Sequence, residues 1–468
     1  MGRFMGLLGI CVFIAMGWAF SRERKAIHWP TVGWALALQW SLAVIVLKGE
    51  MLARALAFLP FPRGSGWGVA ALVVSPALAA RCAGLDRKRL NWIVFAVALV
   101  GVLRGNLVGA AFAAMRLGVA NLMGCANAGA AFVFGPLADP AGAPVAGPGG
   151  VHAGSLGMVF AFVVLPTIIF VASIFAVLYH LGAMQRVIGG FARTLSRFLK
   201  VSGAESVSVA ASVHMGQAEA PLTIRPFLAR LTRSELMVVM TAGMAHVSGA
   251  IMVAYVQVAG VDVAHLLTAV LMTAPGAIMM AKLLEPETGV PETWGDPRVE
   301  LPSTDANVLD AAARGAAEGL QLAFNVAGML VAFIALVALV NGVLRALHPA
   351  LSLERVLGLL FRPFALVMGV PWAEAGQVGA LLGKRMAVNE LVAFIDLGRM
   401  HDLSAKARLI ATFALCGFAN FSSVAIQVGG IGALVPERRG DLARLGVKAM
   451  LAGTMANALS ACIAGVLG

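Results

Sequence analysis

Charged residues are scarce in this chain: Asp, Glu, Lys and Arg make up 12% of its 468 residues. A soluble globular protein carries about 25% charged residues, so this shortage excludes a disordered chain and a soluble nucleic-acid-binding protein. Cysteine is also rare. The cysteines have no CxxC or metal-ligand spacing and predict neither a disulfide framework nor a metal centre; they are Cys11, Cys82, Cys125, Cys416 and Cys462.

Hydrophobic residues, by contrast, make up 60% of the chain, and the mean hydropathy is +0.88. Apolar runs of 17 or more residues, long enough to cross a bilayer, recur from Phe4 almost to Gly468. Because backbone exposed to lipid must satisfy its own hydrogen bonds, these runs predict helices. We therefore expect an all-α polytopic membrane protein with about ten transmembrane helices.

The net charge of +12 comes from basic residues that cluster in short loops between the apolar runs. Four such clusters lie at 21–29, 81–89, 186–200 and 438–448. The positive-inside rule places all four in the cytoplasm if the N-terminus and the C-terminus both lie outside. This orientation requires the moderately apolar stretch 111–135 not to cross, so we interpret it as an interfacial helix.

Two apolar segments, 207–227 and 377–397, contain polar residues that a lipid-facing helix should not have. The polar residues of these segments include Ser212, His214, Gln217, Glu219, Lys384, Arg385, Asn389, Glu390 and Asp396. A carboxylate at membrane depth costs several kcal/mol, so it must face a cavity or a partner. A polar surface loop is the alternative, but the apolar flanks of both segments favour a position within the membrane.

The same order of segments occurs twice in the chain. Each polar segment is followed by a span with a small-residue, polar centre, at 243–249 and 416–423, and then by a glycine-containing turn and another apolar run. Duplicated spans interrupted by glycine are typical of transporters whose site lies at the repeat interface. Backbone groups freed at such interruptions can bind a substrate or an ion.

Several motifs in these segments resemble the concentrative nucleoside transporter family. They are GQAEAPL (216–222), LTRSE (231–235), GLQLA (319–323), NELVA (389–393), CGFAN (416–420) and PERRGDLAR (436–444). The resemblance runs from about residue 156 to the end and also covers 5–47. Members of this family are known as trimeric importers of nucleosides that use a sodium or proton gradient.

The resemblance implies a transport domain of two inverted repeats that moves like an elevator on a trimeric scaffold. The expected scaffold parts are N-terminal spans (1–154), with an inserted pair (about 50–105) and the interfacial helix (about 111–135), a scaffold span and cytoplasmic amphipathic helix (155–200), a polar loop and surface helix (284–318), and a scaffold span and connector (319–371). The expected first repeat (201–283) has a re-entrant hairpin (204–231), an interrupted helix (234–260) and a helix (263–283). The expected second repeat (372–468) has a hairpin (373–400), an interrupted helix (405–435) and a helix (441–467).

The resemblance also implies which residues bind the substrate. Gln217 and Glu219, at the tip of the first hairpin, match positions that hydrogen-bond the nucleobase. The residue between them is Thr in the family pattern and Ala218 here, which leaves purine or pyrimidine preference open. Glu390 matches the carboxylate that binds the ribose hydroxyls. The other expected substrate residues are the ribose contacts Asn420 and Ser423 and the apolar wall residues Ile251 and Phe418.

These side chains suit a nucleoside on chemical grounds as well. An amide offers both a donor and an acceptor and can pair with the edge of a base. An ionised carboxylate accepts strongly from a vicinal diol, and a few such groups in an apolar pocket fix the orientation of a ligand. Hydrogen bonding between helices is the alternative role for the polar residues of this set.

The coupling ion is expected at Ser212, Met215, His246 and Val247. Sodium-coupled members of the family have Asn at the position of Ser212 and Ser at the position of His246. Losing an amide oxygen and gaining an imidazole weakens a hard-cation site, whereas a histidine can carry a proton at ordinary pH. We therefore favour proton coupling through His246 or a carboxylate such as Glu219. A buried structural histidine beside a shifted sodium site is the alternative.

The sequence thus predicts secondary active import of nucleosides across a bacterial inner membrane, coupled to H+ in preference to Na+. Its expected partners are a nucleoside, the lipid bilayer and further copies of the chain in a homotrimer, with no organic cofactor, no firmly assigned metal and no nucleic acid. A membrane enzyme that uses Glu219 and Glu390 as an acid–base pair is a rival class; no nucleophile elbow or phosphate loop accompanies these carboxylates. A gated channel is a second rival class.

Overall fold

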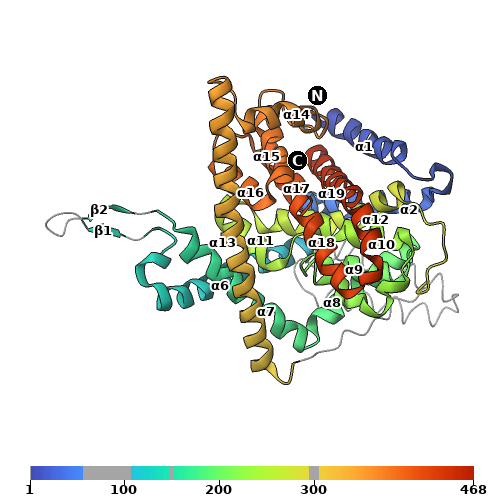
Figure 1. The fold of residues 1–468 in the computed structure, drawn as a ribbon, viewed down its shortest axis with the longest axis horizontal. Helices are drawn as coiled ribbons and strands as arrows, with labels where there is room; N and C mark the ends of the chain where they lie inside the picture. The colour runs from blue at the N-terminus through green and yellow to red at the C-terminus, as the bar shows by residue number, and fades with distance from the viewer. Residues whose placement is uncertain (1, 56–106, 143, 147–151, 156, 295–304) are drawn as a thin grey trace.

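The computed structural model describes residues 2–55, 107–142, 144–146, 152–155, 157–294 and 305–468 (Figure 1). These residues are helical apart from turns and a short antiparallel hairpin of β1 (Pro144–Ala146) and β2 (His152–Ser155). Seven of the described helices are long and apolar enough to cross a membrane, and two shorter apolar helices add to them. The predicted helical membrane fold is confirmed. The expected inserted pair at about 50–105 lies outside the described residues, apart from α3 (Gly49–Ala55).

The N-terminal helices α1 (Gly2–Ala19) and α2 (Trp29–Leu47), joined through η1 (Arg24–Ala26), pack against α12 (Val263–Leu284) and α19 (Arg439–Leu467). A Cβ atom at Gly6 would lie 2.7 Å from the Val466 side chain. The start of α1 therefore lies beside the end of α19, and both chain ends lie at the same end of the molecule (Figure 1). The side of the membrane on which they lie stays a prediction.

Glu285 follows α12 and ties the N-terminal helices to the rest of the molecule. Its side chain is 2% exposed and accepts from Arg22 (2.9 Å), Arg233 (2.8 Å) and Lys448 (2.9 Å). Burial alone would raise the pKa of this carboxyl group. The hydrogen bonds from Arg22 and Lys448 outweigh burial and lower its pKa below the ordinary value of 4.5.

The stretch that we interpret as an interfacial helix forms α6 (Leu107–Phe134), followed by η2 (Gly135–Ala138). Residues Leu107–Ala138 are long and apolar enough to cross a membrane by length and composition, so the interfacial position stays a prediction. Arg116 of α6 forms a two-bond ion pair with Asp262 at the start of α12, at 2.9 and 2.7 Å.

Two helices, α7 (Phe160–His180) and α13 (Val308–Leu347), pack closely along one side of the molecule (Figure 1). Gly315 and Gly319 permit the contact, because a Cβ atom at either would lie within 2.8 Å of α7. With 40 residues, α13 is about 60 Å long. The sequence predicts a separate surface helix before residue 319, but the structure differs: residues 308–318 are the first turns of α13, which starts at the Asn307 N-cap.

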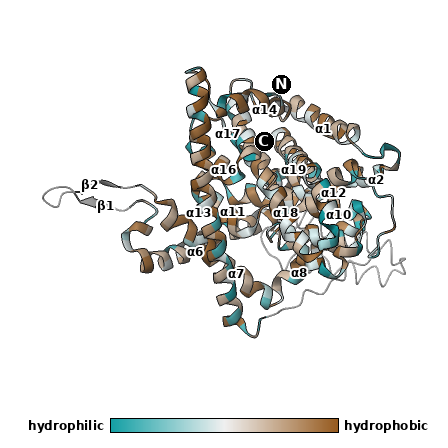
Figure 2. Cartoon of the chain, in the orientation of Figure 1, coloured by the Kyte–Doolittle hydropathy of each residue, from teal (hydrophilic) through white to brown (hydrophobic). Residues whose placement is uncertain are grey.

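The face of α13 that points away from the molecule is apolar, as the hydropathy colouring shows (Figure 2). Its exposed large side chains include Leu320, Phe324, Val331, Ile334, Leu339 and Val343. Lipid or another protein surface must cover such a stripe. By contrast, α8 (Ala183–Leu199) buries one apolar stripe and exposes arginines, which makes it amphipathic.

The two predicted repeats have matching elements in the structure. The first contains α9 (Gly203–Ser212), η4 (Ala220–Arg230), α10 (Arg233–Ala245), α11 (Gly249–Ala259) and α12. After α14 (Leu353–Val367), the second contains α15 (Ala375–Ala387), α16 (Glu390–Arg399), α17 (Ala405–Leu415), α18 (Phe421–Leu434), η5 (Pro436–Arg438) and α19. In each repeat two short elements precede an interrupted helix.

Side-chain caps define where the repeat helices begin. Capping boxes at Ser202 and Thr232 start α9 and α10, and Asn389 and Asn420 accept from backbone amides at the starts of α16 and α18. Breaks therefore interrupt the longer apolar segments at 246–248 and 416–420.

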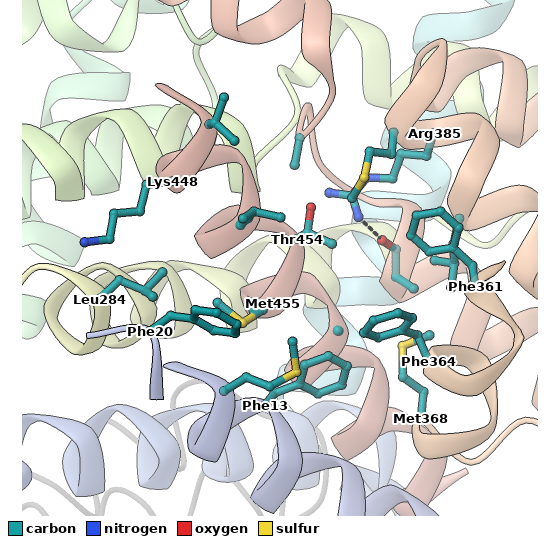
Figure 3. Close-up of a pocket in the computed structure, with 18 of the residues that line it drawn as sticks. Phe13, Phe20, Leu284, Phe361, Phe364, Met368, Arg385, Lys448, Thr454 and Met455 are labelled. Carbon is teal, nitrogen blue, oxygen red and sulfur yellow. Dashed lines mark hydrogen bonds between the residues drawn. The ribbon is translucent and has the colours of Figure 1, made fainter. Parts of the chain in front are cut away.

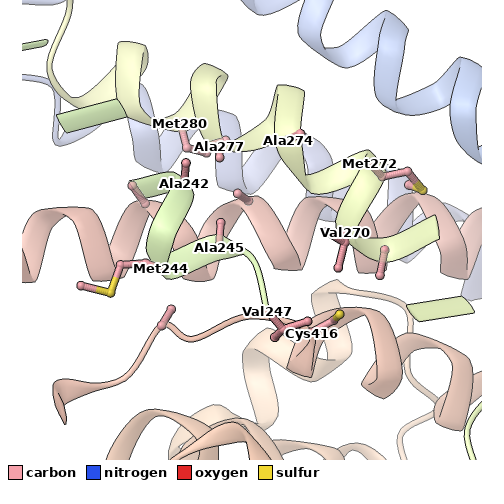
Figure 4. Packing of buried hydrophobic residues seen from close by; sticks show 14 of the residues in the cluster. Ala242, Met244, Ala245, Val247, Val270, Met272, Ala274, Ala277, Met280 and Cys416 are labelled. Atoms are coloured by element: carbon pink, nitrogen blue, oxygen red, sulfur yellow. The ribbon is translucent and has the colours of Figure 1, made fainter. Parts of the chain in front are cut away.

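The core lies where α10, α12 and α19 pack through small side chains (Figure 4). Ala242, Ala245, Ala274 and Ala277 are fully buried there. Small side chains let helix backbones approach closely within a membrane. The same close packing brings Val247 of the first break next to Cys416 of the second.

Candidate functional site

Polar side chains from both hairpins meet at the second break. The amide of Gln217, in the turn after α9, donates to Ser423 Oγ at 3.1 Å. The Ser423 backbone amide donates to Asn420 Oδ1 at 2.9 Å, and Asn420 Nδ2 donates to Glu390 Oε2 at 3.1 Å. All four residues are less than 9% exposed. A continuous hydrogen-bonded chain thus joins the first hairpin, α18 and the second hairpin.

Glu390 is the buried carboxylate of this chain, at the first position of α16. One carboxylate oxygen accepts from Tyr255 Oη at 3.0 Å and the other from Asn420. The Tyr255 ring stacks on Phe394, with ring centroids 4.3 Å apart. Because a carboxylate has about four lone-pair sites, the hydrogen bonds from Tyr255 and Asn420 leave the group able to accept further donors.

Arg385 lies near the end of α15 and is 2% exposed. It donates to the carbonyl oxygens of Ala414 (2.6 Å) and Gly417 (3.1 Å), and to Asn457 Oδ1 (2.6 Å). It also interacts electrostatically with Glu390. An apolar cavity of about 620 Å³ borders Arg385, with Phe361, Phe364 and Met368 on its wall (Figure 3). None of the expected substrate residues lines this cavity.

At the first break, His246 is 1% exposed and caps the end of α10. Its Nδ1 lies 2.9 Å from Ser212 Oγ and 2.8 Å from the Ala242 carbonyl oxygen. Ser212 Oγ itself donates to the Val209 carbonyl oxygen. His246 Nε2 has no hydrogen-bond partner among the described residues. The structure thus places together two of the residues expected to bind the coupling ion.

The remaining expected residues lie around this network. Val247 and Ile251 are buried, whereas Met215 and Phe418 are partly exposed. The Phe418 amide donates to the His246 carbonyl oxygen at 3.2 Å, which links the two breaks.

Glu219 differs from the other expected residues because its side chain is exposed in the single chain. Its Oε2 accepts from the Gly216 amide at 3.1 Å, and it interacts electrostatically with Arg314 and Glu318 of α13 and with Tyr179 of α7. No hydrogen bond within the described part of the chain joins Glu219 to Gln217, Asn420 or Glu390.

Sequence reasoning missed Tyr255, Gln427 and Asn457 in this region, and it marked Arg385 as a polar residue within the membrane without giving it a role in the site. Gln427 Nε2 donates to the Met240 carbonyl oxygen at 3.1 Å and lies 3.4 Å from Gln217 Oε1. A polar residue inside an otherwise apolar span is the signal that could have marked Gln427 and Asn457. In the parts of the chain that the structure describes, no group of three His, Cys, Asp or Glu residues could hold a metal ion.

Comparisons with known protein families match most of the chain. The model "Na+ dependent nucleoside transporter C-terminus" matches residues 265–465, and the corresponding N-terminus model matches 8–60. A third, "Gate: Nucleoside recognition", matches 161–262. Together these matches cover both repeats and the helices α1, α2 and α7.

Individual proteins are similar over most of their length. The chain is 45% identical over 355 residues to the transporter YutK of Bacillus subtilis, covering 74% of this chain and 83% of that protein. It is 33% identical over 471 residues to the nucleoside permease NupC of Helicobacter pylori, covering 98% and 96%. It superimposes on CNTnw in an inward-facing substrate-bound state with a TM-score of 0.81 and 37% identity, covering 100% of this chain and 98% of that one.

The fold and these matches define a membrane transporter of the helical, nucleoside-recognising class, and its relatives are transporters and not enzymes. The similarity to these proteins extends over the described helices from α1 to α19. The chain belongs to the concentrative nucleoside transporter family, as the sequence motifs indicate.

Proposed function

We propose that this protein imports nucleosides across a bacterial inner membrane by coupling them to a cation gradient. The observation that carries the proposal is the hydrogen-bonded chain from Gln217 through Ser423 and Asn420 to Glu390. It brings an amide and a carboxylate from opposite hairpins to one break. A ligand that has both a base and a sugar can contact both ends of this chain.

Glu390 is the group that we assign to the sugar. Tyr255 and Asn420 each occupy one lone pair on different carboxylate oxygens. The carboxylate can therefore accept further hydrogen bonds, and the two hydroxyls of a ribose supply two donors. Hydrogen bonds to a carboxylate are stronger than those between neutral groups. The same hydroxyls contact Asn420 and Ser423 in this proposal.

The base end of the ligand is assigned to Gln217 and Glu219, with Ile251 and Phe418 as apolar walls. Gln217 offers both a donor and an acceptor to a base edge. Ala218 supplies no hydroxyl between them, so a base that needs such a contact binds less tightly. Glu219 faces α7 and α13 in the described structure, and in the proposal it reaches the base only when substrate is bound.

Counterflow in proteoliposomes with a panel of nucleosides and free bases tests the assignment. We expect counterflow with nucleosides and none with free bases, because free bases lack the diol. Glu390→Ala abolishes it, whereas the exposed acid variant Glu437→Ala leaves it intact and controls for surface charge. Intact nucleoside counterflow in Glu390→Ala refutes the ribose assignment.

The coupling ion is proposed to be a proton, with Na+ as the second candidate. In favour of the proton, His246 has an unpartnered Nε2 within the described residues, while its Nδ1 is held by Ser212 and the Ala242 carbonyl. A neutral imidazole with one free nitrogen can accept a proton. In favour of sodium, the matching family models are named for Na+ dependence, and the carbonyl oxygens of Met215 and Val247 remain as hard ligands.

The two candidate ions are separated by uptake at fixed pH with sodium replaced by choline. The proton proposal expects unchanged uptake in choline and faster uptake when the outside is made more acidic. Uptake that collapses without sodium at constant pH rejects it and leaves the sodium candidate.

The transport cycle is proposed to be an elevator movement of the two repeats against α7 and α13. The apolar outward face of α13 supports contact with further copies in a homotrimer, since a stripe of this kind needs a cover. The clusters of basic residues support an outside position for both chain ends. The packing of α1 on α19 brings the two ends close together, which fits this orientation.

A further inference from the structure

A buried arginine stands at the second break with no role in the scheme above. Arg385 is 2% exposed, and a charged side chain at membrane depth is costly unless it is paired or functional. The helix α17 ends at Leu415, so carbonyl groups at the break lack helical partners. Arg385 donates to two oxygens there, Ala414 O at 2.6 Å and Gly417 O at 3.1 Å.

The internal repeat gives this position a counterpart. Ser212 precedes Gln217 by five positions, and Arg385 precedes Glu390 by five positions. Ser212 is the last residue of α9 and Arg385 lies two residues before the end of α15. Each reaches the break that follows: Ser212 contacts His246, and Arg385 contacts Gly417. Arg385 thus takes, in the second repeat, the place that the coupling-ion residues take in the first.

Asn457 of α19 connects the two places. Its Oδ1 accepts from Arg385 at 2.6 Å, while its Nδ2 donates to the carbonyl oxygens of Ala245 (2.8 Å) and Cys416 (2.9 Å). Ala245 is the last residue of α10, directly before the first break, and Cys416 is the first residue of the second break. A Cβ atom at Gly417 would lie 2.4 Å from Asn457 Oδ1. The absence of a side chain at Gly417 therefore leaves room for the Asn457 side chain at the second break.

We propose that Arg385 is a built-in cation that occupies, in the second repeat, the position equivalent to the coupling-ion site of the first. The guanidinium group fills a ring of three oxygen atoms from Ala414, Gly417 and Asn457, and its charge offsets that of Glu390. The transporter therefore needs one mobile cation per nucleoside and not two. If a neutral, flexible side chain replaces Arg385, a monovalent cation can enter the ring, because the carbonyl and amide oxygens then replace the hydration shell of that cation.

This inference rests on the proposed nucleoside function, and it holds whichever ion binds at the first break. A purely structural arginine would also hold the break together, but a mobile cation could not replace it. The cation dependence of ligand binding therefore separates the two roles. The parent protein is measured first, so failure of the nucleoside function is visible as no binding by the parent.

The test compares Arg385→Met and Arg385→Lys with the parent. Lys384→Met is the charge-matched control, because Lys384 precedes Arg385 in α15 but pairs with Asp396 and Glu354. Binding of uridine and of adenosine to the purified proteins is measured at one pH in N-methylglucamine, with lithium, sodium or potassium added. Size-exclusion profiles confirm that each variant is folded.

We expect Arg385→Met to bind at least about 30-fold more weakly than the parent without added alkali cation and to recover with one of the three ions. Its binding then requires one cation more than that of the parent. Arg385→Lys and Lys384→Met keep the cation dependence of the parent. Parent-like binding by Arg385→Met without an added cation overturns the proposal, as does a folded Arg385→Met that no cation rescues. If Arg385→Met does not fold, Arg385→Lys still decides: a new cation requirement there overturns the proposal.

Discussion

The hydroxyl of Tyr255 offers a sharp test of the carboxylate at the centre of the site. Tyr255 Oη donates to Glu390 Oε1 at 3.0 Å, and both side chains are buried. The ring itself stacks on Phe394 with an interplanar angle of 16°. Tyr255→Phe therefore removes one hydrogen bond and keeps the aromatic packing, so the change leaves no large cavity.

The size of the effect follows from the partners of Glu390. A hydrogen bond to a charged group contributes about 1.5–3 kcal/mol. Asn420 still holds the second oxygen, so we expect the lower end of this range, about 1.5 kcal/mol. That free energy corresponds to about a tenfold higher Kd for a ribonucleoside, because the carboxylate is then oriented by one donor in place of two.

The assay is nucleoside binding to the purified protein, with the chain's other tyrosine as the control. The sequence contains two tyrosines, and the Tyr179 hydroxyl is buried without a hydrogen-bond partner among the described residues. Tyr179→Phe should therefore bind like the parent. A parent-like Kd in Tyr255→Phe, or equal losses in both variants, would show that Glu390 does not receive its orientation from Tyr255.

Two further predictions concern the sugar and the stability of the fold. A 2′-deoxynucleoside should compete for uptake about tenfold less well than its ribonucleoside, and this preference should shrink in Glu390→Gln; equal competition in the parent contradicts the diol assignment. Glu285→Gln should lower the free energy of unfolding by about 1–3 kcal/mol at neutral pH, because the side chain at 285 loses its ion pairs with Arg22, Arg233 and Lys448, whose charged groups keep part of their hydration. Because the pKa of Glu285 is lowered in the folded protein, its stabilisation is present above pH 4.5 and is lost as the pH falls through the folded-state pKa. The thermal midpoints of parent and variant should therefore converge in acid. A constant difference at all pH values would exclude the Glu285 ion pairs as the source of the stabilisation.

Local sequence signals lie where the longer helices are interrupted or begin. The segment 243–249 contains Gly, Ser and His within an apolar run, and the structure breaks the helix at 246–248. Asn389 and Asn420 stand where N-caps start α16 and α18. These features depend on neighbouring residues, so one sequence is enough to find them.

Long-range partners explain what the sequence did not indicate. Tyr255 contacts Glu390 across 135 positions, and Arg385 contacts Asn457 across 72; no local spacing encodes either pair. The continuous helix α13 was missed for a different reason. The sequence places the start of its apolar run near Gly319, but no proline separates that run from the polar turns beginning at Val308.

One amide group shared between the two halves of the protein has a thermodynamic consequence. Asn457 cannot shift toward Ala245 without changing its geometry at Cys416. A ligand that moves Asn457 at one interruption would therefore change the affinity for a ligand at the other, and by the same factor in both directions, since such linkage is reciprocal. A single side chain of α19 can in this way make occupancy by the driving ion and occupancy by the cargo depend on each other.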